Sequence, residues 1–292
     1  MTARWVEVEV RLDPALAEGV AELVARLGQG LVEERAGKRV VYRAYLPADE
    51  RTDERVTQLR ERLGALKAAG LPGKAQISLR PVGDQDWQEA WKAHFHTLRV
   101  APNLVVAPSW EQYQAAAGEA VVVLDPGMAF GTGQHPTTRG CLAALARLVQ
   151  PGWRVIDVGT GSGILAIAAA KLGAGWVLAI DEDQAALAVA AQNVRRNGVA
   201  RQVELRAGNL LGGVGEQAEL ILANIVAEAI VELAPQVLGH LAPGGRLVAS
   251  GIVAAKQELV RQALGRAGLA VLEAWREGEW VTLVAGSTGE EG

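Results

Sequence analysis

Cysteine, basic charge and long apolar runs are all scarce in this chain of 292 residues. Its single cysteine, Cys141, excludes an internal disulfide and is typical of a protein from a reducing compartment. The 29 Lys and Arg residues are outnumbered by 33 Asp and Glu residues, and a net charge of -4 argues against direct binding to nucleic acid. The first residues lack the apolar core of a signal peptide, and no uninterrupted apolar run reaches ~18 residues. We therefore expect a cytoplasmic protein without a membrane segment.

Aromatic residues make up only 4% of the chain, yet Trp87, Trp91 and Phe95 recur at four-residue spacing. This spacing places them on one stripe of a helix, which favours a connector packed between two domains over an aromatic face that grips a substrate. His94 and His96 lie in the same segment, but they have no acidic or cysteine partner at the spacing of metal ligands. We therefore expect no metal site.

The length of the chain and its 50% content of hydrophobic residues predict two domains, each with its own core. Alternating apolar residues predict a strand over 4–12, and Asp13-Pro14 predicts the start of a helix that ends at Gly28. The other elements of this domain are strands over 31–35 and 39–46, a helix over 50–68 and a strand over 76–80. The order β-α-β-β-α-β over residues 1–82 is typical of a small α+β, ferredoxin-like domain. Residues 83–117 would form a connector helix and a linker.

Strands and helices alternate in the second domain, over residues 118–286, which precedes a flexible tail at 287–292. We predict strands over 120–124, 153–158, 176–181, 202–206, 218–223, 244–251, 269–274 and 279–285, and helices over 137–149, 163–172, 183–197, 227–239 and 255–267. Nearly continuous apolar strands that alternate with helices indicate an α/β fold with a doubly wound, Rossmann-like parallel sheet. The last two strands are joined by a short connection, Arg276-Glu277-Gly278, so they must form an antiparallel hairpin at the end of the sheet.

A glycine-rich loop connects the strand over 153–158 to the next helix. Gly159, Gly161 and Gly163 leave the backbone bare, so a ligand can lie against it, and the start of the helix favours negative charge. A dinucleotide-binding loop would carry its third glycine at the position of Ile164. This departure, together with the terminal hairpin, disfavours a nicotinamide-dependent oxidoreductase.

Two further strand ends carry polar residues that suit a nucleoside. Asp181 ends the next strand about twenty residues after the loop, where a carboxylate can accept hydrogen bonds from both hydroxyls of a ribose. Asp183 is the predicted N-cap of the following helix. Asn209 follows the third strand, where it either meets the edge of an adenine ring or serves as a turn residue.

Two longer runs carry a resemblance to a known family. One is Asp125–Thr138, which contains Phe-Gly-Thr-Gly-Gln-His-Pro-Thr-Thr, and the other is Leu222–Ala227. With the glycine loop and the acidic strand end, the chain resembles the class I S-adenosylmethionine-dependent methyltransferases, and these runs, with Val106–Trp110, resemble in particular the bacterial ribosomal protein L11 methyltransferases. The first eighty residues match in layout more than in motif. The resemblance implies a seven-stranded methyltransferase sheet and S-adenosylmethionine as the cofactor.

The resemblance also implies a set of cofactor contacts at the carboxyl ends of the strands. In physical terms, the Thr138 hydroxyl at a helix start can bind the methionine carboxylate, while Asp181 holds the ribose. The full set of expected contacts is Thr138, Gly159, Gly161, Gly163, Asp181, Asn209 and Asn224.

Asn224, Ile225 and Phe130 are the expected catalytic residues. Oxygen acceptors at Asn224 and Ile225 would receive an N–H from the substrate amine and orient its lone pair. Phe130 would lie in a mobile lid beside the sulfonium, and a rigid loop with Phe130 in the core is the alternative. His135 is the nearest candidate base, but a hydrogen bond that structures its loop is the favoured interpretation.

The implied reaction transfers methyl groups to lysine side chains and the N-terminal amine of ribosomal protein L11. Residues 1–82 would recognise that protein substrate, and the enzyme would act as a monomer. Three alternatives stay open: a lysine methyltransferase with another protein target, a small-molecule methyltransferase, and a cofactor-binding module without catalytic activity.

Overall fold

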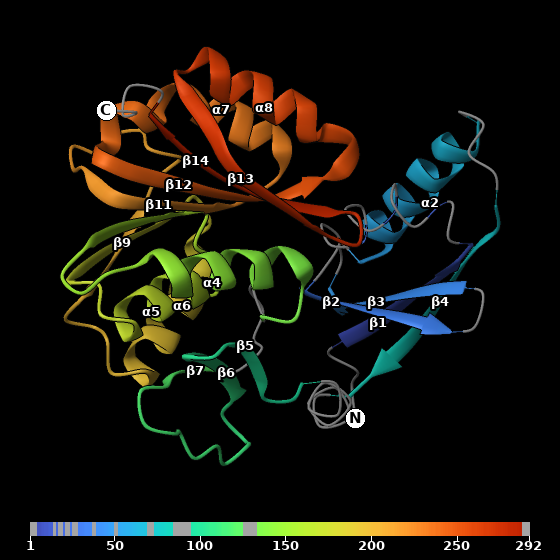
Figure 1. Ribbon diagram of the computed structural model, residues 1–292. Coiled ribbons are helices and arrows are strands. Elements are labelled where there is room, and N and C mark those ends of the chain that lie inside the picture. The colour runs from blue at the N-terminus through green and yellow to red at the C-terminus, as the bar shows by residue number, and fades with distance from the viewer. Residues whose placement is uncertain are drawn as a thin grey trace. The chain divides into compact units, whose positions relative to one another are not determined.

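The computed structural model describes the chain in two compact units, Met1–His96 and Thr97–Gly292 (Figure 1). Three predicted features fall on residues outside the described part: most of the helix after Asp13, the helix that carries Trp87 and Trp91, and the loop that contains Phe130. The tail after Ser287 lies outside it as well. The described residues are 5–13, 29–36, 39–49, 52–68, 73–83, 95–124 and 133–287, together with Leu16, Val20 and Val24.

The first unit contains a four-stranded antiparallel sheet in the order β2-β3-β1-β4. This order confirms the predicted ferredoxin-like arrangement. Along β1, Val8, Val10 and Leu12 are fully buried, as the alternation of a strand with one covered face requires. The elements are β1 (Trp5–Leu12), β2 (Gln29–Ala36), β3 (Arg39–Pro47), α2 (Thr52–Ala68) and β4 (Ala75–Val82).

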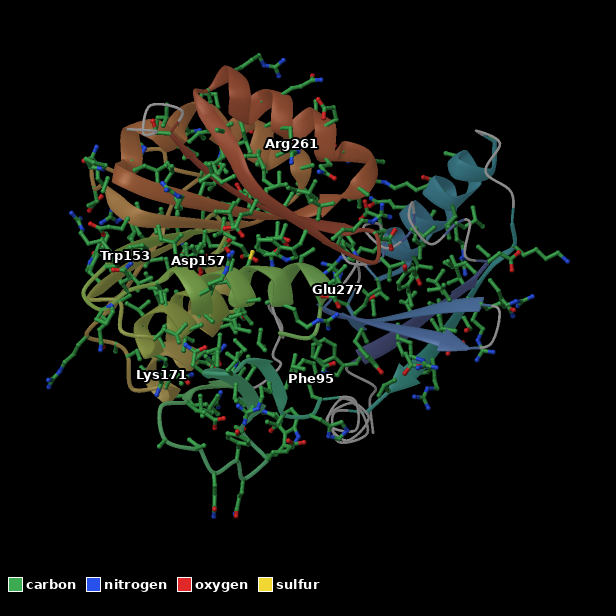
Figure 2. All side chains as sticks on the ribbon, in the orientation of Figure 1. Phe95, Trp153, Asp157, Lys171, Arg261 and Glu277 are labelled. Carbon is green, nitrogen blue, oxygen red and sulfur yellow. The ribbon has the colours of Figure 1, made fainter. Side chains whose placement is uncertain are left out.

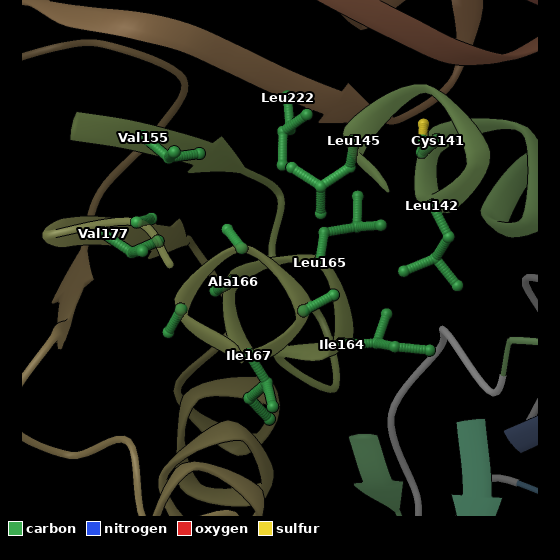
Figure 3. Packing of buried hydrophobic residues seen from close by; sticks show 14 of the residues in the cluster. Cys141, Leu142, Leu145, Val155, Ile164, Leu165, Ala166, Ile167, Val177 and Leu222 are labelled. Carbon is green, nitrogen blue, oxygen red and sulfur yellow. The ribbon is translucent and has the colours of Figure 1, made fainter. Parts of the chain in front are cut away.

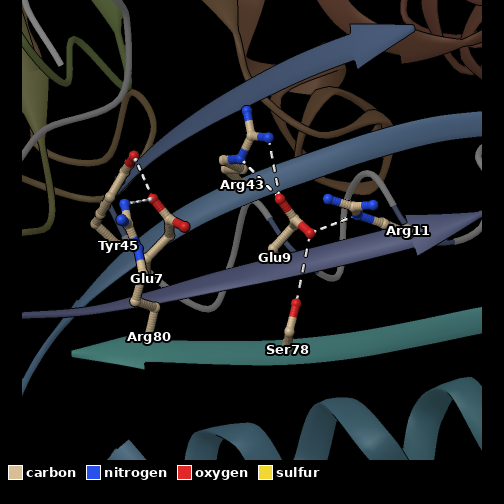
Figure 4. A network of polar contacts seen from close by, with 7 residues as sticks. All are labelled: Glu7, Glu9, Arg11, Arg43, Tyr45, Ser78 and Arg80. Atoms are coloured by element: carbon tan, nitrogen blue, oxygen red, sulfur yellow. Dashed lines mark hydrogen bonds and ion pairs between the residues drawn. The ribbon is translucent and has the colours of Figure 1, made fainter. Parts of the chain in front are cut away.

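The opposite face of this sheet carries a network of charged side chains (Figure 4). Glu7 of β1 accepts hydrogen bonds from Tyr45 of β3 at 3.0 Å and from Arg80 of β4 at 3.1 Å. Glu9, two residues further along, accepts from Arg43 of β3 at 3.1 Å. Burial raises the pKa of the Tyr45 phenol, so this hydroxyl remains a donor to the carboxylate. The network therefore joins β1 to both of its neighbours.

The second unit begins with a three-stranded sheet of β5 (Leu98–Ala101), β6 (Leu104–Pro108) and β7 (Ala120–Leu124). The sequence predicted β7, but it assigned residues 97–117 to a connector and linker. The interpretation of 98–108 as a connector is corrected by the structure, because every residue of β6 is buried and Leu104 and Val106 belong to the core of the second unit. Pro102 lies between these two short strands and Pro108 ends the second, and prolines at such spacing are typical of a linker.

The main sheet of the second unit has seven strands in the order β10-β9-β8-β11-β12-β14-β13. All neighbouring pairs from β10 to β12 are parallel, whereas β14 runs antiparallel between β12 and β13. This confirms the predicted doubly wound sheet with a terminal antiparallel hairpin. The strands are β8 (Arg154–Val158), β9 (Trp176–Asp181), β10 (Val203–Ala207), β11 (Ala218–Asn224), β12 (Leu241–Val253), β13 (Leu269–Glu277) and β14 (Trp280–Ser287).

Helices cover both faces of this sheet and create two apolar cores. Successive residues of the central strand enter different cores, since Val155 belongs to the core with α4, α5 and α6, whereas Ile156 belongs to the core with α7 and α8. Figure 3 shows the first core, in which Cys141 of α4 is fully buried. No helix among the described residues is long and apolar enough to span a membrane. The helices are α4 (Pro136–Leu148), α5 (Ile164–Lys171), α6 (Gln184–Arg196), α7 (Ala227–His240), η1 (Ala254–Lys256) and α8 (Gln257–Arg266).

Candidate active site

The candidate site lies at the carboxyl edge of the parallel strands, where the strand order reverses. From β8 the chain proceeds to β9 and β10 on one side, and later to β11 and β12 on the other. Open α/β sheets bind ligands at such a reversal because the loops on its two sides turn away from each other. The sequence-predicted residues Gly159, Asp181 and Asn224 follow or end the three strands that meet there.

The glycine loop after β8 adopts a conformation that side chains disfavour. Gly159, Gly161 and Gly163 have φ values of 70°, 54° and 82°. The amides of Gly159 and Thr160 both donate to the carbonyl of Ile180 at 2.9 Å, which joins the loop to β9. A Cβ at Gly159 would collide with the side chain of Ile225. The loop backbone is therefore bare because both its conformation and its close packing require glycine.

Asp157 of β8 stabilises this loop through hydrogen bonds, and the sequence did not predict this role. Its Oδ2 accepts from Thr160 Oγ1 at 2.6 Å and from the amide of Ala166 at 3.2 Å. Because Gly163, the N-cap of α5, has no side chain, the Asp157 carboxyl acts as the cap of that helix. Burial raises the pKa of Asp157 to about 7. A carboxylate inside an otherwise apolar strand was the available sequence signal.

Asp181 connects the ends of three strands. Its Oδ2 accepts from the amide of Gly161 at 2.8 Å, its Oδ1 from the amide of Asp183 at 3.0 Å, and its backbone carbonyl from the amide of Gly208 at 3.0 Å. An ionised carboxylate offers about four acceptor positions, so further acceptor capacity remains. Asp183 caps α6 through a bond from Ala185, as predicted. The half-buried Asp181 is thus oriented by backbone amides and can still accept from a diol.

Asn209 lies in a turn immediately after β10. Its carbonyl accepts from the amide of Gly212 at 3.1 Å, and the next residue, Leu210, has a positive φ of 51°. The side chain of Asn209 is exposed. The backbone geometry fits the interpretation of Asn209 as a turn residue, and contact with an adenine ring stays a prediction.

Thr138 and Asn224, 86 residues apart in the sequence, meet across the reversal point. Asn224 Nδ2 donates to Thr138 Oγ1 at 3.2 Å. Thr138 is fully buried, and the Oδ1 atom of Asn224 is buried without a hydrogen-bond partner in the described part of the chain. An unsatisfied buried acceptor costs about 1–3 kcal/mol. The site therefore contains an oxygen atom that a ligand with an N–H or O–H group would satisfy.

Ile225 is wedged between two glycines. A Cβ at Gly159 would strike its side chain, and a Cβ at Gly251 would strike its backbone carbonyl. Gly251, which has a φ of 85° and follows Ser250 in β12, was not singled out from the sequence. Packing from both sides fixes the backbone that follows Asn224.

His135 is the N-cap of α4, which agrees with its favoured interpretation as a structural residue. Its Nδ1 accepts from the amide of Thr137 at 3.4 Å and lies 2.8 Å from the Thr137 hydroxyl. Burial lowers the pKa of His135 to about 4, and the charge of Arg139 acts in the same direction. The imidazole is therefore neutral at pH 7. Phe130, the remaining predicted site residue, lies outside the described residues.

The chemistry of this edge combines three elements. The glycine loop offers bare backbone beside a helix start, Asp181 offers carboxylate oxygens, and Asn224 offers a buried amide oxygen. Within the described residues, no group of three or more His, Cys, Asp or Glu side chains has the arrangement of a metal site. The arrangement fits a nucleoside ligand on the β9 side and a hydrogen-bond donor at the end of β11.

Comparison with known proteins confirms the family resemblance. A family model described as "Ribosomal protein L11 methyltransferase (PrmA)" matches residues 4–288. A ribosomal protein L11 methyltransferase of Pelotomaculum thermopropionicum is 45% identical, with 96% of this chain and 98% of the relative covered. One from Chloroflexus aurantiacus is 41% identical, with 97% of this chain and 98% of the relative covered.

One solved structure supports the same relationship. The crystal structure of a ribosomal protein L11 methylase from Lactobacillus delbrueckii subsp. bulgaricus has a TM-score of 0.62 and 37% sequence identity to this chain. The match covers 66% of this chain and 99% of that chain.

Proposed function

The chain belongs to the ribosomal protein L11 methyltransferase family, and on this premise we propose that it methylates amino groups of ribosomal protein L11. The amino groups are lysine side chains and the N-terminal amine, and the methyl donor is S-adenosylmethionine. The observation that carries the proposal is the unpartnered Oδ1 of Asn224 at the strand reversal. It is an acceptor placed where an incoming amine requires one.

The residues of the site fit S-adenosylmethionine. Asp181 would hold the ribose hydroxyls, the bare backbone at Gly159 and Gly161 would lie against the methionine portion, and the Thr138 hydroxyl would bind the carboxylate. Gly163 would keep the helix start open to that group, and Asn209 would flank the adenine. When bound, S-adenosylmethionine supplies an electrophilic methyl group on a sulfonium ion.

Asn224 would orient the substrate amine. Its Oδ1 can accept one N–H of a neutral amine, while its Nδ2 is already engaged with Thr138, so the side chain cannot rotate without losing that bond. The carbonyl of Ile225 follows directly and is held by close packing against Gly251. Methyl transfer is an in-line displacement, and positioning of this kind supplies on the order of several kcal/mol.

The amine must lose a proton before it reacts, since a free alkyl ammonium has a pKa of about 10.4. His135 does not fit the role of base because it caps α4. We propose instead that withdrawal of the amine from water favours its neutral form, with Phe130 as part of the covering loop. The displaced proton would return to solvent before the amine enters.

The first unit is proposed to recognise the protein substrate. The first unit, Met1–His96, has its own buried core, and we propose that its residues 1–82 bind the substrate while the catalytic residues 118–286 lie in the second unit. Separate modules allow several amines on one protein to reach a single site. A cytoplasmic location agrees with the single, buried cysteine.

Mass spectrometry of purified ribosomal protein L11 tests the proposal. We expect mass increases in steps of one methyl group after incubation with the enzyme and S-adenosylmethionine, located on lysines and the N-terminus. A second ribosomal protein rich in lysine is the matched control and should remain unmodified. An unmodified L11, or equal modification of both proteins, would contradict the proposed specificity and favour another protein target.

A further inference from the structure

Helix α4 lies along the β13–β14 hairpin, and two ion pairs of the same kind mark the ends of this contact. Arg139 in the first turn of α4 pairs with Glu277, which lies at the end of β13 and is labelled in Figure 2. Arg147 in the last turn pairs with Glu273 at 2.7 Å. Eight helical residues rise about 12 Å and four strand residues about 13 Å, so the spacings match when α4 runs antiparallel to β13.

The ion pair near the start of α4 makes more hydrogen bonds than the pair near its end. Besides Glu277, the Arg139 guanidinium donates to the backbone carbonyl of Gln134, in the segment that leads into the helix. Its Nε also lies 3.4 Å from the second oxygen of Glu277. One side chain thus ties the incoming segment, the first turn of α4 and the hairpin together.

An aromatic contact holds the same junction. Trp280 is the ladder partner of Glu277, so the two side chains lie on the same face of the hairpin. The Trp280 ring meets the ring of His135 edge to face, with centroids 4.8 Å apart. Because His135 is the N-cap of α4, the hairpin tip contacts the helix start by a second, independent route.

Thr138 lies in the same first turn of α4. It is fully buried, and its hydroxyl accepts the bond from Asn224 that orients the amide. Gly140 permits close approach of the same turn to the hairpin, since a Cβ there would collide with Thr282. A shift of the first turn of α4 therefore moves the Thr138 hydroxyl relative to the end of β11.

We propose that the tip of the β13–β14 hairpin is a clamp for the cofactor site, in which Glu277 and Trp280 position Thr138 through Arg139 and His135. These four are positioning residues, because they act on the site through the helix start. The proposal rests on the proposed function, since it assumes that S-adenosylmethionine binds beside Thr138.

Calorimetric titration of S-adenosylmethionine into paired variants tests the clamp. Arg139→Ala, Glu277→Ala and the double variant break the near pair, while Arg147→Ala, Glu273→Ala and their double variant break the matched far pair. We expect each near-pair variant to weaken binding about three- to tenfold, with the double variant no weaker than the singles. The far-pair variants should bind as tightly as the native enzyme, although both sets of variants lower the melting temperature.

The two proposals fail in different ways. Native enzyme that binds no S-adenosylmethionine contradicts the proposed function. If the native enzyme binds S-adenosylmethionine and the near-pair and far-pair variants bind it with equal affinity, the clamp is contradicted. The proposed function is not affected by that result.

The aromatic contact is tested separately by conservative variants. His135→Asn keeps a good N-cap acceptor but removes the ring, and Trp280→Phe keeps an aromatic ring that Trp280→Ala removes. We expect His135→Asn and Trp280→Ala to raise the KM for S-adenosylmethionine severalfold without a change in the KM for the protein substrate. Trp280→Phe should restore most of the loss. Native KM values in Trp280→Ala would overturn the role of the tryptophan.

Discussion

Among the described residues of the second unit, two buried side-chain oxygen atoms lack a hydrogen-bond partner, and their chemistry differs: Oδ1 of Asp157 beside the glycine loop and Oδ1 of Asn224 at the end of β11. Asp157 can relieve the cost by taking up a proton, and burial raises its pKa to about 7 accordingly. The amide of Asn224 does not titrate, so its oxygen cannot be satisfied by taking up a proton and requires a hydrogen-bond donor such as an amine. The Asp157 carboxyl therefore stabilises the glycine loop, whereas the Asn224 amide oxygen is available to accept a hydrogen bond from a substrate.

The largest expected effect is the loss of kcat on removal of the Asn224 side chain. Asn224→Ala should lower kcat by about 100-fold, since the amine loses its orienting partner, while the melting temperature stays near the native value. Steady-state kinetics and thermal unfolding measure the two quantities.

Asn197 provides the matched control. Asn197 is a buried asparagine whose side chain is fully engaged with the backbone of Val123 and Asn193. Asn197→Ala should lower the melting temperature and leave kcat per folded enzyme unchanged. Equal losses of kcat in Asn224→Ala and Asn197→Ala would contradict a specific role of Asn224 in orienting the amine.

The next effect concerns the acidic end of β9. Asp181→Asn should weaken S-adenosylmethionine binding about tenfold or more, because hydrogen bonds to a charged acceptor contribute about 1.5–3 kcal/mol. Asp183→Asn is the control, since asparagine is an equally good N-cap for α6. Binding constants from calorimetry should differ between the two variants, and similar constants would argue against a ribose contact at Asp181.

A smaller effect is expected from filling the bare backbone. Gly159→Ala introduces about 1–2 kcal/mol of left-handed strain and a collision with Ile225. Gly198→Ala introduces the same strain at φ 69° with no atom within 4 Å of the new Cβ. Denaturant unfolding should therefore show a larger loss for Gly159→Ala, and equal losses would mean that Ile225 does not constrain the loop.

The pH dependence of stability should change as well, and there two groups act in opposite directions. The raised pKa of Asp157 means that the folded protein holds an extra proton, so this group's contribution falls as pH rises from about 4 to about 7. The lowered pKa of His135 means the reverse, and its contribution is lost as pH falls from about 6.5 to about 4.

Variants that no longer titrate separate these contributions. Relative to the native enzyme, Asp157→Asn should gain stability as pH rises through that window, whereas His135→Asn should gain stability as pH falls. Melting temperatures measured at pH 4.5 and 7.5 should shift by on the order of a few degrees. Shifts of the same sign in both variants would contradict the assignment.

The sequence predicted those parts of the molecule that depend on local patterns. Periodic apolar residues gave the main sheet and its hairpin, and the position of Asp183 before a helical pattern gave its role as N-cap. The short strands β5 and β6 were missed because Pro102 between them and Pro108 at the end of β6 are typical of a linker. Thr138 and Asn224 were named as cofactor contacts only through the family resemblance, and the hydrogen bond between them was not predicted.

Contacts between elements that are distant in the sequence could not be predicted from the sequence alone. Arg139 and Glu277 are 138 residues apart, and their pairing requires the register of α4 over the hairpin. The cap that Asp157 supplies to α5 likewise requires the loop to fold back over β8. Such pairs follow from tertiary geometry, which no single-sequence period encodes.

A crystal structure of the enzyme with S-adenosylhomocysteine tests the central claim most directly. We expect both ribose hydroxyls within hydrogen-bond distance of the Asp181 carboxylate and the sulfur atom directed toward the space beside Asn224 Oδ1. A nucleoside bound away from Asp181, or a sulfur on the opposite side of the sheet edge from Asn224, would contradict the account.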